Sequence, residues 1–233
     1  MILTEEKLYQ DIWRRKETLS DGFLPSRAAE ALNVLKSANI LLDIGCGDGT
    51  FAARAKDKYQ RVIGLDLSRT ALRMVGRQEI FSLQTNINRG YLPLKNKSVD
   101  VVSCLDVVEH VFDPYYLLNE IFRVLTDQGE VILTPPNTRF IEHISAIVFK
   151  GIAPKTSMDM EQYDGGHLHY FTFKDIERIL DECSFKVILK KGIALRFYRS
   201  FKTRAFYLCS KLWEKDPLRE FFNWGILIKA VKK

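Results

Sequence analysis

The sequence predicts an α/β protein built on a doubly wound, mostly parallel sheet, and three observations support this prediction. Short apolar runs of strand length alternate with stretches of helical periodicity along most of the 233 residues. Three glycines at alternate positions, 45, 47 and 49, follow the first of these runs, as expected where a strand turns into a helix. A hydrophobic content of 46% is enough to bury one sizeable core, so we expect residues 1–233 to form a single domain.

Seven segments have the length and apolar content of strands, at residues 40–45, 61–66, 79–84, 99–104, 130–134, 185–191 and 225–231. Helical patterns lie between most of them, at residues 49–58, 69–77, 114–125 and 172–183. The helix at 114–125 has an N-cap residue and an N-terminal proline in Asp113-Pro114, and Gly129 follows its expected end. No clear helix separates the last two strands, which could therefore pair antiparallel.

Two segments lie outside this alternation. Residues 4–36 are expected to be helical, with an apolar stripe at Leu8, Ile12 and Leu19 and a second helix over 27–36. Residues 137–171 form an insertion after the fifth strand that is too long for an ordinary connection. Within this insertion, residues 140–149 have the pattern of an amphipathic helix.

The charge of the chain is unevenly distributed. The formal net charge is +6, but residues 186–233 alone contain 13 Lys and Arg against 3 Asp and Glu. Within them, residues 196–207 interleave basic with aromatic side chains, so this stretch could contact a membrane surface, a phosphorylated carrier or nucleic acid. The alternative is a solvated basic helix whose aromatic side chains pack inward.

Cysteine usage and hydropathy indicate a cytoplasmic protein. Cys46, Cys104, Cys183 and Cys209 are scattered and form no CxxC pair, which favours a reducing compartment over a disulfide framework or a zinc site. No run of about 18 apolar residues is present, so we expect no membrane span. The first residues also lack the basic head and apolar core of a signal peptide.

The turn at residues 45–49 is the most informative motif. It sits at the carboxyl end of a predicted strand, where open α/β sheets bind nucleotide-like ligands. The dinucleotide fingerprint requires a further glycine where this chain has Thr50, which disfavours a nicotinamide-dependent oxidoreductase. Asp66 ends the next strand, and its carboxylate can accept two hydrogen bonds from a ribose diol. Asp43, just before the turn, suits a cationic ligand better than a diphosphate.

These residues resemble the class I S-adenosylmethionine-dependent methyltransferases of types 11 and 23. The resemblance covers roughly residues 25–190 and continues, in the family's order, through residues 63–66, 92–94, 98–102, 104–111, 120–125, 129–137 and 166–172. It implies a Rossmann-like sheet of seven strands with an antiparallel last strand, and S-adenosylmethionine as the methyl donor. It also implies that residues 1–36 cover the cofactor and that residues 137–171 build the acceptor pocket.

The resemblance further implies where the cofactor lies. The glycines would approach its methionine part, Asp66 would bind the ribose, and Leu67 would pack beside the adenine. Asn86 stands where relatives often have an acidic residue, and its amide oxygen can still accept a hydrogen bond from the adenine amino group. The complete predicted set is Asp43, Gly45, Cys46, Gly47, Gly49, Asp66, Leu67, Asn86, Ile87, Leu105 and Asp106.

Methyl transfer mainly requires that acceptor, methyl group and sulfur be aligned, and a hydroxyl acceptor also needs a base. His110, His167 and His169 fall near the expected acceptor pocket and are our candidate bases. Alternatively, Glu109 and His110 only order their loop. Asp106, Glu109 and His110 also resemble the metal ligands of some ubiquinone-pathway O-methyltransferases. Because Glu-His also occurs here in relatives without metal, we expect no metal.

The sequence thus predicts a methyltransferase acting on a small-molecule, lipid-linked or glycan-linked acceptor, most simply at oxygen. A catalytically silent protein that binds S-adenosylmethionine as a partner or sensor would have the same glycine turn. A nucleic-acid methyltransferase is disfavoured because an Asn/Asp-Pro-Pro-aromatic motif would end the fourth strand, where this chain has Cys104-Leu105-Asp106. Peripheral membrane contact through the basic C-terminal part, the acceptor's identity and the oligomeric state stay open.

Overall fold

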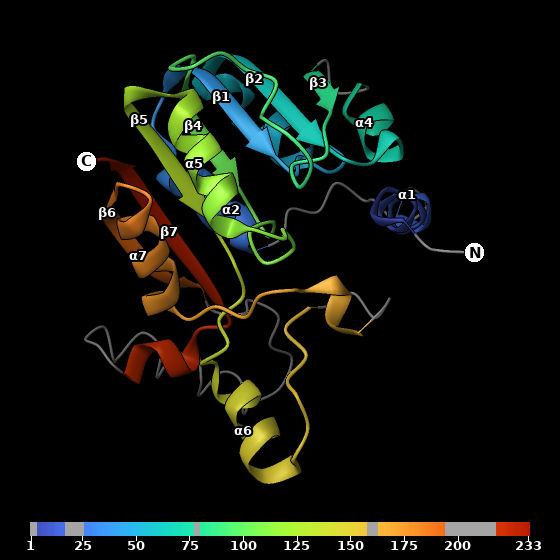
Figure 1. The fold of residues 1–233 in the computed structure, drawn as a ribbon, viewed down its shortest axis with the longest axis vertical. Coiled ribbons are helices and arrows are strands. Elements are labelled where there is room, and N and C mark those ends of the chain that lie inside the picture. Colours follow the sequence, from blue (N-terminus) through green and yellow to red (C-terminus); the bar gives the residue numbers. More distant parts are fainter. Residues whose placement is uncertain (1–3, 17–25, 77–79, 158–162, 194–217) are drawn as a thin grey trace.

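The structure is a computed structural model that describes residues 4–16, 26–76, 80–157, 163–193 and 218–233. Its strands form one sheet in the order β3-β2-β1-β4-β5-β7-β6 (Figure 1). The strands are β1 (Ala38–Ile44), β2 (Tyr59–Asp66), β3 (Phe81–Gln84), β4 (Val99–Cys104), β5 (Leu125–Leu133), β6 (Phe185–Ile193) and β7 (Gly225–Lys232). From β3 to β5 the neighbours pair parallel, whereas β7 is antiparallel to both β5 and β6. The predicted fold class is therefore confirmed, including the reversed last strand.

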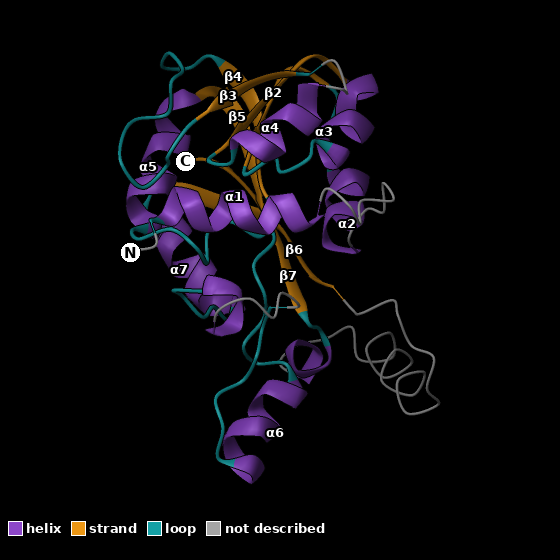
Figure 2. Ribbon diagram, turned by 90° about the vertical axis from the view of Figure 1, so that its right-hand side faces the viewer, coloured by secondary structure: helices purple, strands orange, loops and turns teal. Residues whose placement is uncertain are grey.

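The helices cover both faces of the sheet, as the edge-on view in Figure 2 shows. They are α1 (Glu5–Lys16), α2 (Ser26–Val34), α3 (Thr50–Ala55), α4 (Arg69–Gly76), α5 (Pro114–Val124), α6 (Ile141–Lys150) and α7 (Phe173–Glu182), with short 3-10 helices at Lys56–Lys58, Tyr163–Gly166 and Leu218–Phe222. Helices α5 and α7 pack on one face, and α2, α3 and α4 pack on the other. No described helix is long and apolar enough to cross a bilayer.

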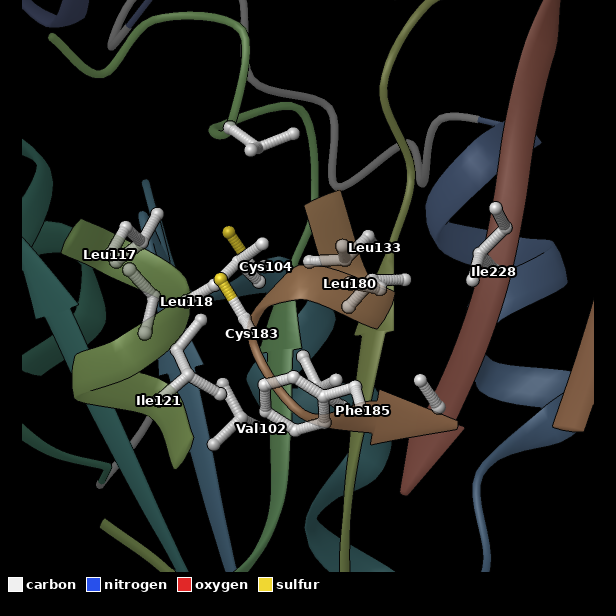
Figure 3. Packing of buried hydrophobic residues seen from close by; sticks show 14 of the residues in the cluster. Val102, Cys104, Leu117, Leu118, Ile121, Leu133, Leu180, Cys183, Phe185 and Ile228 are labelled. Carbon is white, nitrogen blue, oxygen red and sulfur yellow. The ribbon is translucent and has the colours of Figure 1, made fainter. Parts of the chain in front are cut away.

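The core between α5, α7 and the sheet is made of interlocking aliphatic and aromatic side chains (Figure 3). Leu118 and Ile121 of α5 face Val102 of β4, while Leu180 of α7 lies over Leu133 of β5. All five side chains are fully buried, and burying each contributes about 1.5–3 kcal/mol. This packing holds rigid the two strands from which the candidate site's loops begin.

The opposite face has a flatter core because small side chains let the helices approach the sheet closely. Ala31 of α2 and Ala52 and Ala55 of α3 are fully buried there. In β1, Leu41 points to this face and Leu42 to the other, and neither is exposed to water. A strand that is apolar on both sides is what a parallel sheet covered by helices requires.

Helix α5 begins as predicted and ends one residue before the predicted end. Asp113 accepts a hydrogen bond from the backbone N–H of Tyr116 at 3.0 Å, and Pro114 opens the helix. The chain then passes straight from Val124 into β5, so Gly129 follows the helix end as predicted, and the strand begins earlier than the predicted residue 130. Gly129 lies inside β5, where a Cβ would come within 2.8 Å of the Leu125 side chain.

The carboxyl ends of β1 to β5 meet at one edge of the sheet, and the strand order reverses between β1 and β4. Such a reversal leaves a crevice at the strand ends, where α/β proteins bind ligands. Helix α1 lies along this edge, and α6 projects away from it (Figures 1 and 2). Three sequence predictions, on Leu19, Cys209 and the basic stretch 196–207, lie outside the described residues.

Candidate cofactor and acceptor site

The glycine turn has a backbone that only glycine adopts readily. Gly45, Gly47 and Gly49 have φ angles of +69°, +55° and +81°. A Cβ at Gly45 would collide with Val107, and one at Gly47 would come within 2.5 Å of the Trp13 ring. The absence of Cβ atoms at these two positions lets Val107 and Trp13 of α1 approach the backbone of the turn closely. A ligand lying against the turn requires the same absence of side chains.

Asp66 connects the glycine turn to the end of β2. Its carboxylate accepts hydrogen bonds from the backbone N–H groups of Gly47 at 2.9 Å and Ser68 at 2.8 Å. Burial raises the pKa of Asp66, and these hydrogen bonds oppose the rise by stabilising the charged form. The carboxylate thus stands at the turn in the position predicted for a ribose-binding group.

Asp43 is a buried acid at the end of β1. It lies beside Ser103 of β4, whose hydroxyl donates to its Oδ1 at 2.7 Å. Burial raises the pKa of Asp43 to about 7, although the Ser103 hydrogen bond pulls in the other direction. A cation bound nearby would favour the charged form, so this carboxyl is suited to receive a ligand's ammonium group.

Helix α1 is bound to the strand ends by polar side chains whose role the sequence did not reveal. Glu5 accepts hydrogen bonds from Asn86 at 3.3 Å and Asn88 at 2.6 Å, after β3. Gln10 accepts from the backbone and hydroxyl of Thr70, at 3.0 and 2.9 Å, at the start of α4. The pattern of residues 4–36 predicted a helix, but no motif indicated which of its faces would meet the turn.

The remaining predicted cofactor residues line the same edge. Cys46 is buried in the turn, and its backbone N–H donates to the Leu65 carbonyl at 3.0 Å. Leu67 and Ile87 are half-buried after β2 and β3. Leu105 is half-buried after β4. Because the side-chain oxygen of Asn86 also accepts from the Asn88 backbone, its predicted bond to adenine would use the second lone pair.

A buried arginine completes this part of the site. Arg27 of α2 is 7% exposed, and its Nε lies 2.7 Å from Oδ1 of Asp106. Its guanidinium stacks over the Trp224 ring at 4.1 Å. Among the described residues, its Nη1 is buried without a hydrogen-bond partner. Arg27 is therefore a cation with an unused hydrogen-bond donor at the methionine end of the predicted site. The sequence did not indicate this role, because a lone arginine in a helical pattern carries no motif.

Asp106 is held by two neighbours in a strained backbone conformation. Its φ is +55°, in the left-handed region, and the Thr134 hydroxyl donates to its Oδ1 at 3.3 Å. With Arg27 on the same oxygen, the carboxylate is fixed at the end of β4. Strain of this kind is found where a site holds a side chain in a set direction.

Glu109, His110 and His167 come together beside this edge. Glu109 is buried, and neither carboxylate oxygen has a hydrogen-bond partner among the described residues. Burial, and then the nearby Asp106 carboxylate, raise the pKa of Glu109 to about 8. The rings of His110 and His167 pack edge to face with centroids 4.6 Å apart, and His167 Nε2 lies 4.0 Å from the Glu109 carboxylate.

His167 is oriented from behind by two residues of the insertion. Its Nδ1 lies 2.6 Å from the Thr156 hydroxyl and 3.5 Å from the Asp164 carboxylate. Asp164 also accepts from that hydroxyl at 2.7 Å and from the backbone N–H of Ser157 at 2.8 Å. The Thr156 hydroxyl donates its proton to Asp164, so its oxygen can only accept a hydrogen bond from His167. We therefore assign a proton to Nδ1 of His167, which donates to that oxygen. Nε2 then carries the lone pair and faces Glu109.

The other predicted groups are placed differently. His169 Nε2 lies 2.9 Å from the Val111 carbonyl, and its ring stacks on Phe171, so it ties the insertion to the loop after β4. The set of Asp106, Glu109 and His110 that resembles a metal site is divided, because Asp106 pairs with Arg27. Instead, Glu109, His110 and His167 each have one potential ligand atom within 4.8 Å of the others'.

The sheet order, the reversed β7 and a glycine turn faced by Asp66 together define the class I methyltransferase fold. A family model described as a methyltransferase domain, of type 23, matches residues 14–190, and the chain belongs to this family of S-adenosylmethionine-dependent methyltransferases. The predicted cofactor and enzyme class are thereby confirmed.

Two curated relatives show how far the similarity extends. The chain is 36% identical over 97 residues to a protein of Mycolicibacterium smegmatis named a probable S-adenosylmethionine-dependent methyltransferase. That match covers 42% of this chain and 38% of the relative. This chain is also 28% identical over 160 residues to the ubiquinone biosynthesis O-methyltransferase of Aliivibrio fischeri, and that match covers 62% of this chain and 67% of that protein. The chain thus spans well under half of the first relative and two thirds of the second.

Solved structures share the fold across nearly the whole chain. The Haloferax volcanii protein solved in complex with the Trm112 methyltransferase activator has a TM-score of 0.69 at 16% identity, covering 100% of this chain and 99% of that one. A methyltransferase from Thermotoga maritima gives 0.67 at 20% identity, with 97% and 100% covered. The cyclase SpnF gives 0.62 at 16% identity, with 91% and 85% covered. Because a cyclase shares it, this fold alone does not define the reaction.

Proposed function

We propose that this chain transfers the methyl group of S-adenosylmethionine to a hydroxyl oxygen of a small-molecule, lipid-linked or glycan-linked acceptor. The observation that supports this proposal is the group formed by the buried Glu109 and the half-buried His110 and His167 near the end of β4. A hydroxyl must lose its proton as the methyl group arrives, and imidazole takes up protons near neutral pH. The name of the Aliivibrio fischeri relative is consistent with an oxygen acceptor.

His167 is the best-placed base in this proposal. The Thr156 hydroxyl fixes its tautomer, so that the basic nitrogen points toward the cluster. Burial raises the pKa of Glu109 to about 8, which favours its neutral form near pH 7 and weakens its hold on a charged neighbouring imidazole. His110 is the second candidate, with its Nδ1 3.3 Å from the Gly166 carbonyl. We assign His169 to holding the loop.

In this proposal the cofactor lies against the turn and its acidic neighbours. Asp66 would accept hydrogen bonds from the ribose hydroxyls, and Asp43 would face the methionine ammonium group. Arg27 would bind the methionine carboxylate through the Nη1 that has no partner among the described residues. When bound, S-adenosylmethionine supplies an activated methyl group, and the protein's part is to align the acceptor with it and remove a proton.

The test measures label transfer from S-adenosylmethionine with a labelled methyl group to a water-soluble catechol, a prenylated catechol and a primary amine. We expect transfer to at least one catechol, with His167→Gln lowering kcat while the Kd for S-adenosylmethionine stays unchanged. An equal loss of turnover and affinity would mean that His167 is structural. Transfer to the amine but to neither catechol would contradict oxygen chemistry.

The same experiment addresses the alternative of a catalytically silent cofactor-binding protein. Such a protein would bind S-adenosylmethionine with the same turn but transfer no label to any probe. The buried, oriented histidine favours the enzyme, because a sensor has no need of a base behind its cofactor.

A further inference from the structure

Helix α6 stands away from the rest of the molecule. Figures 1 and 2 both show it projecting beyond the sheet edge at which β1 to β5 end. Its base is fixed, because His143 is buried and its Nδ1 lies 2.9 Å from the carbonyl of Asn137. Asn137 in turn donates to the Glu220 and Asn223 carbonyls at 2.7 and 2.8 Å. A rigid base and a projecting end make α6 a well-defined protrusion rather than a loose loop.

The far end of α6 is apolar and exposed. Ile147, Val148 and Phe149 are 56%, 64% and 84% exposed, and Ile152, just beyond the helix, is 58% exposed. We refer to these four residues as the α6 tip. Side chains of this size gathered in one exposed place mark an interaction surface, whereas single exposed apolar residues need no explanation.

The spacing of the tip residues indicates what kind of surface would cover them. Successive residues of an α-helix point about 100° apart, so Ile147, Val148 and Phe149 surround the helix end instead of lining one side. A helix that lies in a protein groove presents apolar residues at i, i+3, i+4 and i+7 on one face. An end that is apolar over more than half of its circumference is suited to enter an apolar layer end-on.

The charges around the tip favour an anionic layer. Lys150, the last residue of α6, is exposed next to Phe149, and residues 143–157 contain no aspartate or glutamate. Lys155 is also exposed, but its backbone lies beside His143 at the base of the helix. Cations next to an apolar insertion are attracted to anionic lipid headgroups. A two-fold contact between copies would instead bring these lysines toward their own counterparts, and like charges oppose association.

We propose that the α6 tip inserts into the surface of a bilayer that contains anionic phospholipid. Because α6 projects from the edge that carries the candidate site, this docking turns the acceptor side of the protein toward the membrane. If the proposed function holds, the acceptor is then a molecule presented at the bilayer surface. This docking site is separate from residues 196–207, on which the membrane contact predicted from the sequence rests.

The experiment is vesicle flotation of the full chain, without cofactor or acceptor. One set of vesicles is phosphatidylcholine alone and the other adds phosphatidylglycerol. We expect the chain to float with the anionic vesicles, and the Val148→Ser/Phe149→Ser variant to lose at least about tenfold in partitioning, since each buried apolar side chain contributes substantially. Lys150→Glu/Lys155→Glu should lose binding to anionic vesicles selectively.

The matched control is Phe81→Ser/Tyr91→Ser, which removes two exposed aromatic side chains, 59% and 75% exposed, from elsewhere on the surface. This control should bind vesicles as the unmodified chain does. All variants should have the same thermal midpoint as the unmodified chain. Absence of vesicle binding, or equal binding by the α6 variant, would overturn the proposal. A dimer in solution that the α6 variant abolishes would also overturn it, by assigning the tip to a second copy. None of these outcomes depends on methyl transfer.

Discussion

Replacing Asp43 by Asn should stabilise the protein while weakening its cofactor site. The carboxyl is buried, and its pKa is raised from 3.8 to about 7. At pH 7 and above, folding therefore moves the charged Asp43 carboxylate into a buried environment that disfavours its charge. Asparagine has nearly the same shape, and its side-chain oxygen can still accept the hydrogen bond from Ser103.

The pH dependence follows from the direction of this shift. Because the folded-state pKa is the higher one, the folded chain keeps a proton that the unfolded chain releases between about pH 4 and 7. Stability contributed by the neutral acid is complete below that window and is lost as pH rises through it. Between pH 5 and 8 the free energy of unfolding of the unmodified chain should fall by about 3 kcal/mol relative to Asp43→Asn.

The assay is urea unfolding of both chains at pH 5 and pH 8, followed by circular dichroism, with calorimetric titration of S-adenosylmethionine on each. We expect the stability difference to grow with pH in favour of Asp43→Asn, and the variant to bind the cofactor more weakly. A stability difference that is the same at both pH values would refute the reasoning, because it would show that Asp43 is not a buried ionisable group.

Three further predictions concern the helix over the turn, the candidate base and metal dependence. Trp13→Ala should raise the Kd for S-adenosylmethionine about tenfold while the thermal midpoint changes little, because Trp13 covers Gly47 at the edge of the fold; an unchanged Kd would show that α1 does not cover the cofactor. Thr156→Val should lower kcat in the catechol assay and shift its pH profile, since His167 loses the hydroxyl that fixes its tautomer; an unaltered profile would remove His167 as the base. Exhaustive chelation should leave methyl transfer intact, because Arg27 holds the Asp106 carboxylate and leaves Glu109 as the one carboxylate beside His110 and His167; activity lost and then restored by Mg²⁺ or Mn²⁺ would contradict this.

The sheet could be predicted from sequence because its signals are local. A strand such as residues 38–44 carries its apolar run and its turn within a dozen residues, so no distant contact is needed to recognise it. Where a prediction erred, a nonlocal contact decided the outcome. The sequence predicts the fifth strand over residues 130–134, but pairing with Val99 of β4 extends it back to Leu125.

The cofactor side of the site could be predicted in part for the same reason. Residues 43–49 and Asp66 follow strands in the order that a parallel sheet brings together. Arg27 and Thr156 could not be found, because their partners lie 79 and 11 positions away, Asp106 and His167, and no periodic pattern relates them. The sequence shows the spacing of Asp106, Glu109 and His110 but not which carboxylate an arginine will hold.

The central claim is that the glycine turn and Asp66 form the S-adenosylmethionine site. Calorimetric titration of S-adenosylmethionine into the unmodified chain and Asp66→Ala tests it directly, with thermal midpoints confirming that both are folded. Loss of two charge-assisted hydrogen bonds should raise the Kd by about a hundredfold or more. An unchanged Kd in a folded Asp66→Ala protein would contradict the assignment of this edge of the sheet as the cofactor site.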